Sequence, residues 1–495
     1  MRRQVEGWRG RGLWAVAAGA GLCAVLALSG AAVAAEDSDP YVYAEDAQKV
    51  SGAPNSTDAP LLRTGEPYRS SLGAGSDGAA YYGVELDGAA NAYVSAVAVP
   101  PLGTGVKVAY SDGFTVTLQD RKGNRCDSER ATFRSGAYPR PVAAAAARLV
   151  RPGGLRCQAA GTYYVVVERK ADAESTQEAW GLELKVATEP GLVSATPTEG
   201  PKAWPSASVR PPSGKAARRT GGTGFNDAEA LPTGVWKDGI RPGESHFYRI
   251  PVDWGQQLFV DAELGSSAGD TSRRGFVTGA LDMELYNPAR ASVAAKETSY
   301  AGDPTSATFD PLPPVAYENR YLMRGDQAAM RLAGWYYLKV TLNPAMAGKF
   351  GEKESGLTLR VTVDGEARQA PDYVRDPAEF QVTAADREAA ERGEGGAVWG
   401  DSGSAGGDAG GGRGDESGSA GSGGASPGGG AAAPGSSSAS PASASSSSSA
   451  ESGGMMLLGV SGVGTGTALV LWLGVWRVVA VRRVRGRMRA ERVGG

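Results

Sequence analysis

The feature that most constrains the fold is a strand-like pattern that the chain contains twice. The stretch AGTYYVVVERK begins at Ala160, and AGWYYLKVTLN begins at Ala333. Both are rich in aromatic and β-branched residues, and their side chains alternate with the period of two that is typical of a β-strand. A strand buries its apolar side only against other elements, so each copy implies a sandwich with its own core.

The repeat extends well beyond this strand. Further matches occur in the same order: 62–65 with 231–234, 81–99 with 247–264, 114–123 with 281–290, and 180–188 with 355–363. Almost nothing between them has a sustained helical period. The sequence therefore predicts an all-β fold with two tandem, jelly-roll-like β-sandwich domains, at 58–189 and 224–366.

The segments around these blocks have other compositions. The stretch 190–223 is rich in Pro and Gly and is interpreted as a linker, so each block is expected to fold alone and separate on proteolysis. Residues 36–57 are expected to be a flexible N-terminal segment. In the extension at 367–392, Thr383 and Asp386 have the spacing of a capping box, which predicts a short helix at about 384–392.

Both chain ends indicate a membrane address. Residues 1–35 combine early arginines, an apolar run and Ala-Val-Ala, as in a cleaved signal peptide; a retained anchor is the alternative. The Gly-, Ser- and Ala-rich stretch 393–453 is predicted to be a disordered linker. Residues 455–476 carry no charge and predict one transmembrane helix, and the basic tail 477–495 is expected in the cytoplasm. We expect a single-pass type I protein of the cell membrane with an extracellular ectodomain.

Charge and glycine spacing limit the partners. The chain has a net charge of −3; the signal contributes +3 and the tail +6, which leaves −12 for the part between them. This acidity argues against nucleic acid or acidic wall polymers as bulk electrostatic partners, although a local basic patch is compatible with it. Gly462 and Gly466 form one GxxxG pattern, which permits helix pairing, but glycine is common in such helices.

Two cysteines, Cys126 and Cys157, follow the signal peptide. In an exported chain such a pair is expected to form a disulfide, whose loop closure would contribute about 3 kcal/mol. A metal site is the weaker alternative, since His246 is the sequence's one histidine.

No catalytic residue is predicted. His246 follows Ser245 directly, so the two would point to opposite faces of a strand, and we expect a surface or edge histidine. Paired carboxylates of a glycosidase are the remaining enzymatic alternative. The candidates alternate on predicted strands, where solvated faces are the simpler interpretation: Asp253, Asp261, Glu263, Asp282 and Glu284.

The segment FNDAEALPTGVWKDGIRPGESHFYRIPV, then LDMELYNPAR and GWYYLKVTL, resembles the bacterial pre-peptidase C-terminal domain. The likeness covers about 224–345 and, more loosely, 60–189. It implies a non-catalytic β-sandwich without a cofactor, apart from the calcium alternative that follows. Asn226 and Asp227 match that family's Asn-Asp start, so the resemblance leaves a calcium site there as an alternative. The whole chain also resembles membrane-anchored surface proteins of high-GC Gram-positive, actinobacterial type.

Consecutive aromatic residues on a strand cannot both face the core. For Tyr164 and Tyr336 we expect packing under neighbouring elements, with a carbohydrate or protein platform as the alternative.

Together these observations predict a non-catalytic, membrane-anchored cell-surface protein that displays two β-sandwich binding domains towards an envelope protein or a cell-wall glycan. The alternatives are an accessory subunit of a membrane complex and a glycosidase with paired carboxylates.

Overall fold

The computed structural model describes residues 41–74, 78–103, 105–194, 197–267 and 275–393. Outside them lie the predicted signal peptide at 1–35, the linker from 394 onwards, the membrane helix at 455–476 with Gly462 and Gly466, and the tail at 477–495. Within the described residues, no helix is both long and apolar enough to span a bilayer.

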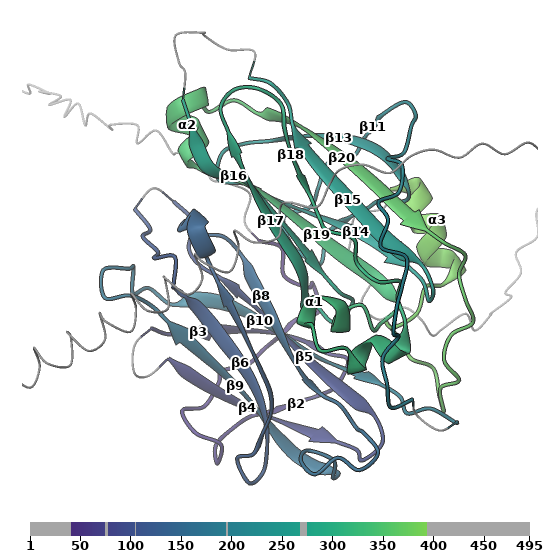
Figure 1. Ribbon diagram of the computed structural model, residues 1–495. Helices are drawn as coiled ribbons and strands as arrows, with labels where there is room; N and C mark the ends of the chain where they lie inside the picture. Colours follow the sequence, from purple (N-terminus) through teal and green to yellow (C-terminus); the bar gives the residue numbers. More distant parts are fainter. Residues whose placement is uncertain (1–40, 75–77, 104, 195–196, 268–274, 394–495) are drawn as a thin grey trace, which may run out of the picture. The chain divides into compact units, whose positions relative to one another are not determined.

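The first sandwich is drawn in purple and blue in Figure 1. Its strands are β1 (Gln48–Lys49), β2 (Leu61–Leu62), β3 (Pro67–Leu72), β4 (Ala79–Leu86), β5 (Asn91–Val99), β6 (Gly113–Asp120), β7 (Arg125–Thr132), β8 (Val142–Arg148), β9 (Gly161–Lys170) and β10 (Trp180–Glu189). They form two five-stranded sheets, with the orders β1-β3-β10-β5-β8 and β2-β4-β9-β6-β7.

The second sandwich has the same plan. Its strands are β11 (Ala217–Arg218), β12 (Glu229–Ala230), β13 (Gly234–Ile240), β14 (Ser245–Val252), β15 (Gln257–Leu264), β16 (Val277–Tyr286), β17 (Ser292–Tyr300), β18 (Thr305–Thr308), β19 (Gly334–Leu342) and β20 (Ser355–Asp364). The sheet orders are β11-β13-β20-β15-β18 and β12-β14-β19-β16-β17. Each strand thus occupies the place of the strand ten numbers before it. The predicted all-β fold with two sandwiches is confirmed.

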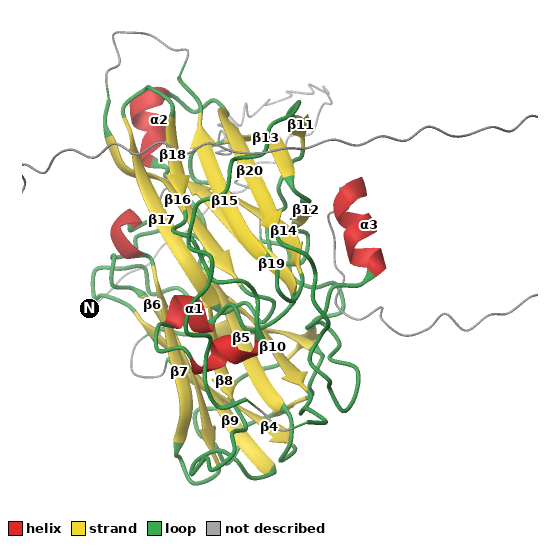
Figure 2. Ribbon diagram, turned by 45° about the vertical axis from the view of Figure 1, so that its right-hand side comes forward, coloured by secondary structure: helices red, strands yellow, loops and turns green. Residues whose placement is uncertain are grey.

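Helices are few and short (Figure 2). They are η2 (Arg134–Gly136), η3 (Tyr317–Tyr321), α1 (Gly325–Ala328), α2 (Ala345–Phe350) and α3 (Ala384–Arg392). The short helix expected at about 384–392 is α3. The Thr383 hydroxyl accepts a hydrogen bond from the Asp386 backbone N–H at 3.1 Å, and the Asp386 carboxylate accepts one from the Thr383 N–H at 2.7 Å. This reciprocal pair satisfies N–H groups that the first turn would otherwise leave unpaired.

The repeated stretch builds the central strand of one sheet in each sandwich, β9 and β19. In both copies a glycine with positive φ opens the strand, Gly161 at 137° and Gly334 at 132°. Glycine adopts this conformation without a steric penalty. Two residues later, Tyr163 and Tyr336 turn into the cores, and each hydroxyl donates to the carbonyl oxygen four residues earlier, at 2.7 and 2.8 Å. The shared Gly and Tyr therefore serve one local structure used twice.

Each sandwich has its own apolar core, as predicted. The first core lies between the two sheets around Tyr82 and Trp180, and the second lies around Tyr248 and Trp254. Full burial of one large apolar side chain contributes about 1.5–3 kcal/mol.

The two sandwiches also pack against each other, and one face of each is buried in the interface. In β8 every residue is buried, and in β19 all but Trp335 are buried, so neither strand has a solvated face. Aromatic rings fill part of this interface, with Phe225 in edge-on contact with Phe247, Tyr286 and Tyr337. Val97 and Ala143 of the first sandwich pack on the same cluster.

Glu183 of β10 is a buried charge in this interface. Its side chain is 1% exposed and forms a salt bridge with Arg290 of the second sandwich. It also accepts hydrogen bonds from the Tyr41 hydroxyl at 3.2 Å and from Asn226 Nδ2 at 2.9 Å. A buried carboxylate needs such partners because it has lost its hydration.

Glu189, at the end of the same strand, is fully buried and binds Arg320 of the second sandwich through two hydrogen bonds of 3.0 and 2.8 Å. Its other donors are Asn91, Tyr93 and Tyr373. Burial raises the pKa of this carboxyl, but the Arg320 charge and the hydrogen bonds outweigh burial, so the net pKa is lowered. The group stays ionised within the interface.

The flanking segments are part of this packing. Residues 41–57, expected to be flexible, place Tyr41 in the interface and pair β1 with β3. The beginning of the 190–223 linker pairs with the extension at 367–392, through the Val193 N–H and the Asp372 carbonyl at 2.7 Å. Both sandwiches consequently belong to one compact unit. The expectation that they separate as independent fragments did not foresee this buried, charged interface.

Candidate functional site

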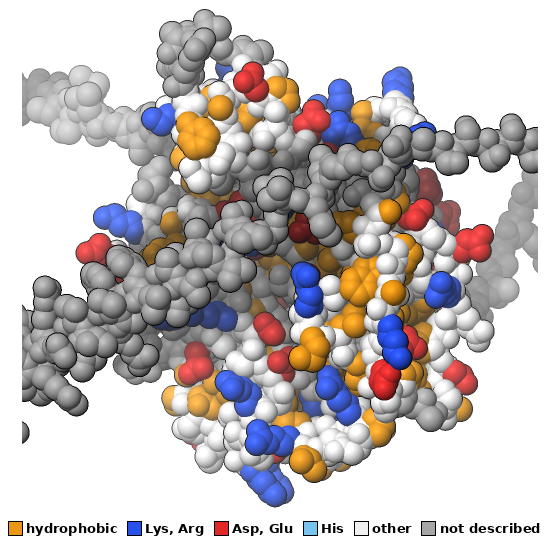
Figure 3. Space-filling view, viewed as in Figure 1, with side chains coloured by type: hydrophobic (Ala, Val, Ile, Leu, Met, Phe, Trp, Pro, Cys, Tyr) orange, Lys and Arg blue, Asp and Glu red, His pale blue; other side chains and the backbone are white. Residues whose placement is uncertain are grey.

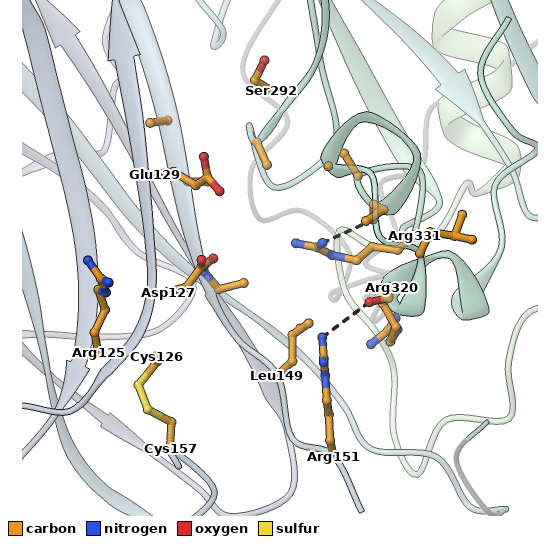
Figure 4. A pocket seen from close by; sticks show the side chains of 18 of the residues that line it. Arg125, Cys126, Asp127, Glu129, Leu149, Arg151, Cys157, Ser292, Arg320 and Arg331 are labelled. Carbon is orange, nitrogen blue, oxygen red and sulfur yellow. Dashed lines mark hydrogen bonds between the residues drawn. A yellow bond between two sulfur atoms is a disulfide. The ribbon is translucent and has the colours of Figure 1, made fainter. Parts of the chain in front are cut away.

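A cleft of about 670 Å³ opens between the two sandwiches (Figure 4). On one side it is lined by Asp127 and Glu129 of β7. On the other side it is lined by the second sandwich, from Arg320 in η3 through α1 to Arg331. It is therefore formed only when both sandwiches are in place.

The cleft is hollow because of the composition of β8. This strand reads VAAAAAR, and Ala144 and Ala146 belong to the core of the first sandwich. Because side chains alternate along a strand, Ala143, Ala145 and Ala147 face the other way, and all three line the cleft. Their methyl groups are too short to fill the space that larger side chains would occupy.

The lining is strongly basic. Apart from Arg320, which is paired with Glu189, it contains five arginines and two carboxylates: Arg125, Arg130, Arg151, Arg156, Arg331, Asp127 and Glu129. Within the described part of the chain, none of those five arginines forms a salt bridge. The cleft is thus a local basic site in a chain whose net charge is −3. Figure 3 shows basic and acidic side chains intermixed in the lower part of the view, where the first sandwich lies.

Arg151 and Arg331 are held in place by contacts that leave most of their donors available. Arg151 Nη2 donates to the Arg320 carbonyl at 3.4 Å, and Arg331 Nη1 donates to the Ala328 carbonyl at 3.2 Å (Figure 4). Their guanidinium groups lie 5.5 and 5.4 Å from tyrosine rings. Among the described residues, Arg331 Nε is buried without a hydrogen-bond partner. Planar guanidinium groups placed in this way suit carboxylate or phosphate oxygens.

The two carboxylates of the cleft differ in environment. Asp127 accepts hydrogen bonds from the backbone N–H of Ala147 and of Ser128, at 2.8 and 2.9 Å, so it is occupied in holding β7 to β8. Burial and the Asp127 charge raise the pKa of Glu129, while Arg331 opposes the shift. Asp127 is therefore not a free partner for acid–base work with Glu129.

The predicted disulfide between Cys126 and Cys157 is confirmed, and both cysteines line the cleft. It ties β7 to the loop that precedes β9. The same loop is held by Arg148, whose Nε donates to the Cys157 carbonyl at 2.8 Å. The disulfide therefore fixes one side of the cleft.

The Asn226–Asp227 pair has other contacts. Asn226 is buried, its Oδ1 accepts a hydrogen bond from Arg290 at 2.9 Å, and its Nδ2 donates to the Val42 carbonyl and to Glu183. Asp227 accepts from the backbone N–H of Thr223 and Gly224. An oxygen already bonded to a guanidinium does not fit a calcium ligand. Calcium binding here stays a prediction from the resemblance, and the described residues contain no cluster of acidic, His or Cys side chains able to hold a metal.

The five strand carboxylates do not converge on a cleft. Asp261 and Glu263 pair with Arg360 on a half-buried sheet face, and Asp253 pairs with Arg387 of α3 at 2.5 Å. These three are tied up in structural ion pairs.

Asp282 and Glu284 correct the expectation of a solvated face. They are buried against the first sandwich, where Arg134 contacts both, at 2.5 and 2.9 Å. Lys339 forms a salt bridge with Glu284. Burial raises the pKa of Glu284, but Lys339 and Arg134 outweigh it and lower the pKa to about 2. The outward face of β16 alternates as predicted, but it faces another domain instead of water.

His246 is also buried, and not a surface residue as expected. Its Nδ1 lies 2.7 Å from Asp238, and its Nε2 lies 3.4 Å from Glu244. Burial lowers its pKa, but these two carboxylates outweigh burial and raise it to about 9. The neighbouring Ser245 hydroxyl bonds to Thr341, so no Ser–His pair forms.

The aromatic prediction was correct about packing and wrong about which tyrosine is outward on β19. Tyr336 faces the core, and Tyr337 is the outward residue, buried under the interface cluster. Tyr164, its counterpart on β9, is half-buried. Among the described residues that line the cleft, none is Phe, Tyr or Trp.

Sequence reasoning missed the cleft, whose residues come from β7, β8 and a connection in the second sandwich. The one available signal was the run of five alanines in a segment with strand-like neighbours. Alanine is depleted in strands, so the run was a sign of a special surface.

No protein family model matches the chain, and no curated protein sequence matches it. Among solved structures, a pre-peptidase C-terminal domain of a collagenase from Bacillus anthracis is 18% identical, with a TM-score of 0.16; the match covers 26% of this chain and 94% of that one.

Two further likenesses span both sandwiches. The N-terminal CBM22-1-CBM22-2 tandem domain of Xyn10C from Paenibacillus barcinonensis is 11% identical, with a TM-score of 0.16, over 57% of this chain and 82% of that one. The ANX1 ectodomain from Arabidopsis thaliana is 12% identical, with a TM-score of 0.17, over 63% and 92%. At these scores the likenesses assign this chain to no family.

Proposed function

We propose that this chain is a non-catalytic binding protein of the cell surface, held to the membrane by the segment at 455–476. Its two sandwiches act as one body, and the cleft between them receives the ligand, a protein or a glycan of the envelope. The observation that carries this proposal is the cleft itself, which is walled by both sandwiches and lined by five arginines that form no salt bridge among the described residues.

The interface supports a binding role because it makes the cleft rigid. Arg320 stands at the boundary: its side chain is locked to Glu189, while its carbonyl accepts the hydrogen bond from Arg151. A site whose walls are fixed before binding loses less conformational entropy when the ligand arrives. Two domains that moved independently would not keep such a cleft open.

The residues around the cleft support binding over catalysis. Asp127 is engaged by backbone N–H groups, and His246 lies in a separate network with Asp238 and Glu244. A retaining or inverting glycosidase needs two available carboxyl groups on either side of a sugar ring.

The test uses the full chain in detergent micelles, with poly-L-glutamate and polygalacturonate as fluorescent probes. We expect saturable binding of at least one probe, at least about 10-fold weaker in Arg331→Glu, because the charge reversal removes a guanidinium that would pair with a carboxylate of the probe. The matched control is Arg360→Glu, at a half-buried arginine that does not line the cleft, which should bind like the unmodified chain.

The same incubations also test for turnover. Each probe should be recovered at its original mass. Binding of neither probe, or equal binding by Arg331→Glu, would overturn the proposed site. Cleavage of polygalacturonate that is lost in Glu129→Gln would establish the glycosidase alternative instead.

A further inference from the structure

We infer that the natural occupant of the cleft is an acidic segment of another envelope protein that also carries apolar side chains. This inference rests on the proposed function and specifies its ligand. It depends on three features of the cleft: the unpaired arginines, the lack of aromatic side chains in its lining, and large apolar side chains at its rim.

The arginines set the charge of the partner. Arg125, Arg151, Arg156 and Arg331 line one cleft, and none of them forms a salt bridge among the described residues; Glu129 is the carboxylate that the Arg331 charge influences. Their mutual repulsion is relieved when carboxylates enter, and each guanidinium can hold a carboxylate through two parallel hydrogen bonds. The rest of the exterior sequence is acidic, so an acidic partner is repelled elsewhere and attracted here.

The composition of the lining separates a protein from a glycan. Apart from charged groups, the described lining is formed mainly by alanines with Leu149 and Leu322, and it contains no Phe, Tyr or Trp on which a sugar could stack. The nearby Tyr321 and Tyr93 rings instead lie against the Arg151 and Arg331 guanidinium groups. Methyl and isobutyl groups instead suit aliphatic side chains. The lining therefore favours a polypeptide with acidic and aliphatic residues.

Two side chains at the rim strengthen this assignment. Leu155 is 99% exposed and Met323 is 100% exposed. Leu155 lies between the lining residues Gly154 and Arg156, and Met323 follows the lining residue Leu322. Met and Arg are enriched in protein–protein interfaces. One residue belongs to each sandwich, so a bound segment would contact both.

The experiment measures binding to the full chain in detergent micelles by fluorescence anisotropy. The probe is a short labelled peptide of Glu, Leu and Ala, and the comparison peptide has Gln in place of every Glu. Polygalacturonate is the glycan probe. We expect the acidic peptide to bind at least about 10-fold more tightly than the Gln peptide, and its affinity to fall with added salt.

The double variant Leu155→Ala/Met323→Ala tests the rim. Both side chains are exposed, so folding should not change. The variant should bind the acidic peptide about 10-fold more weakly and should bind polygalacturonate no differently. Arg360→Glu is again the matched control.

The outcomes separate this inference from the proposed function. Polygalacturonate bound more tightly than the peptide, with loss in Arg331→Glu, would overturn the protein partner but keep the cleft as the binding site. Equal binding of the Glu and Gln peptides, or no effect of the rim variant, would also refute the inference. Failure of every probe would refute both.

Discussion

The buried pair between Glu189 and Arg320 gives the sharpest test of how the two sandwiches are joined. In Glu189→Gln the side chain keeps its size, but Arg320 is left as a buried charge without a counter-ion. Breaking a buried ion pair at one partner costs about 3–5 kcal/mol. The structure places this case at the upper end, because the carboxylate is fully buried and accepts hydrogen bonds from four residues.

The assay is urea unfolding of the full chain in non-ionic detergent, followed by tryptophan fluorescence. A matched control is Glu263→Gln, because Glu263 also binds an arginine at 2.8 Å but is 32% exposed. Exposed pairs contribute about 0–1 kcal/mol, so this variant should unfold almost like the unmodified chain.

A second variant separates the loss of the Glu189–Arg320 attraction from the cost of leaving Arg320 buried without a counter-ion. In Glu189→Gln/Arg320→Met the uncompensated guanidinium is gone, so the free energy of unfolding should recover part of the loss. The reasoning is refuted if Glu189→Gln and Glu263→Gln have the same free energy of unfolding. It is also refuted if the double variant loses as much free energy of unfolding as Glu189→Gln and Arg320→Met lose together.

Three further outcomes are expected. The pKa of His246 is about 9 in the folded chain and near 6.5 in the unfolded chain. Protonated His246 should therefore stabilise the fold by roughly 3 kcal/mol below pH 6.5, and this stabilisation should be lost as the pH rises through 9. Thermal melts across that pH range should show this dependence in the unmodified chain and not in His246→Gln. Reducing the Cys126–Cys157 disulfide, or replacing both residues by Ser, should lower stability by about 3 kcal/mol in urea titrations and weaken binding in the cleft; an unchanged midpoint would contradict this. Limited proteolysis should leave one resistant core containing both sandwiches, with one melting transition; two separately stable fragments would show that the interface is not binding them together.

The sequence predicted the architecture well because short local sequence patterns determine the strands and turns. Alternation, turn glycines and the AGxYY stretches are each decided within a few residues, and Tyr163 and Tyr336 repeat one hydrogen bond in both sandwiches. The Thr383–Asp386 cap is equally local. The disulfide could be predicted because only two cysteines follow the predicted signal peptide, which allows a single intramolecular pairing.

What the sequence did not reveal is what covers an outward strand face. Asp282 and Glu284 alternate with apolar residues as solvated side chains would, and only the second sandwich's contact with Arg134 distinguishes the two cases. Likewise, Arg151 and Arg331 come from opposite walls of the cleft, and no spacing in the chain relates them. Contacts between domains depend on three-dimensional placement, and the period of a strand contains no information about it.

The ten-strand offset between the sandwiches has an evolutionary consequence. Tyr164 and Tyr337 occupy the same place on equivalent strands, yet Tyr164 is half-buried and Tyr337 is sealed beneath a neighbouring domain. After a duplication, the first position stays free to drift, while the second is constrained by a neighbour that a single ancestral copy lacked. Loss of either half would expose Glu183 or Arg290 without its partner. We therefore expect the two domains to be retained or lost together.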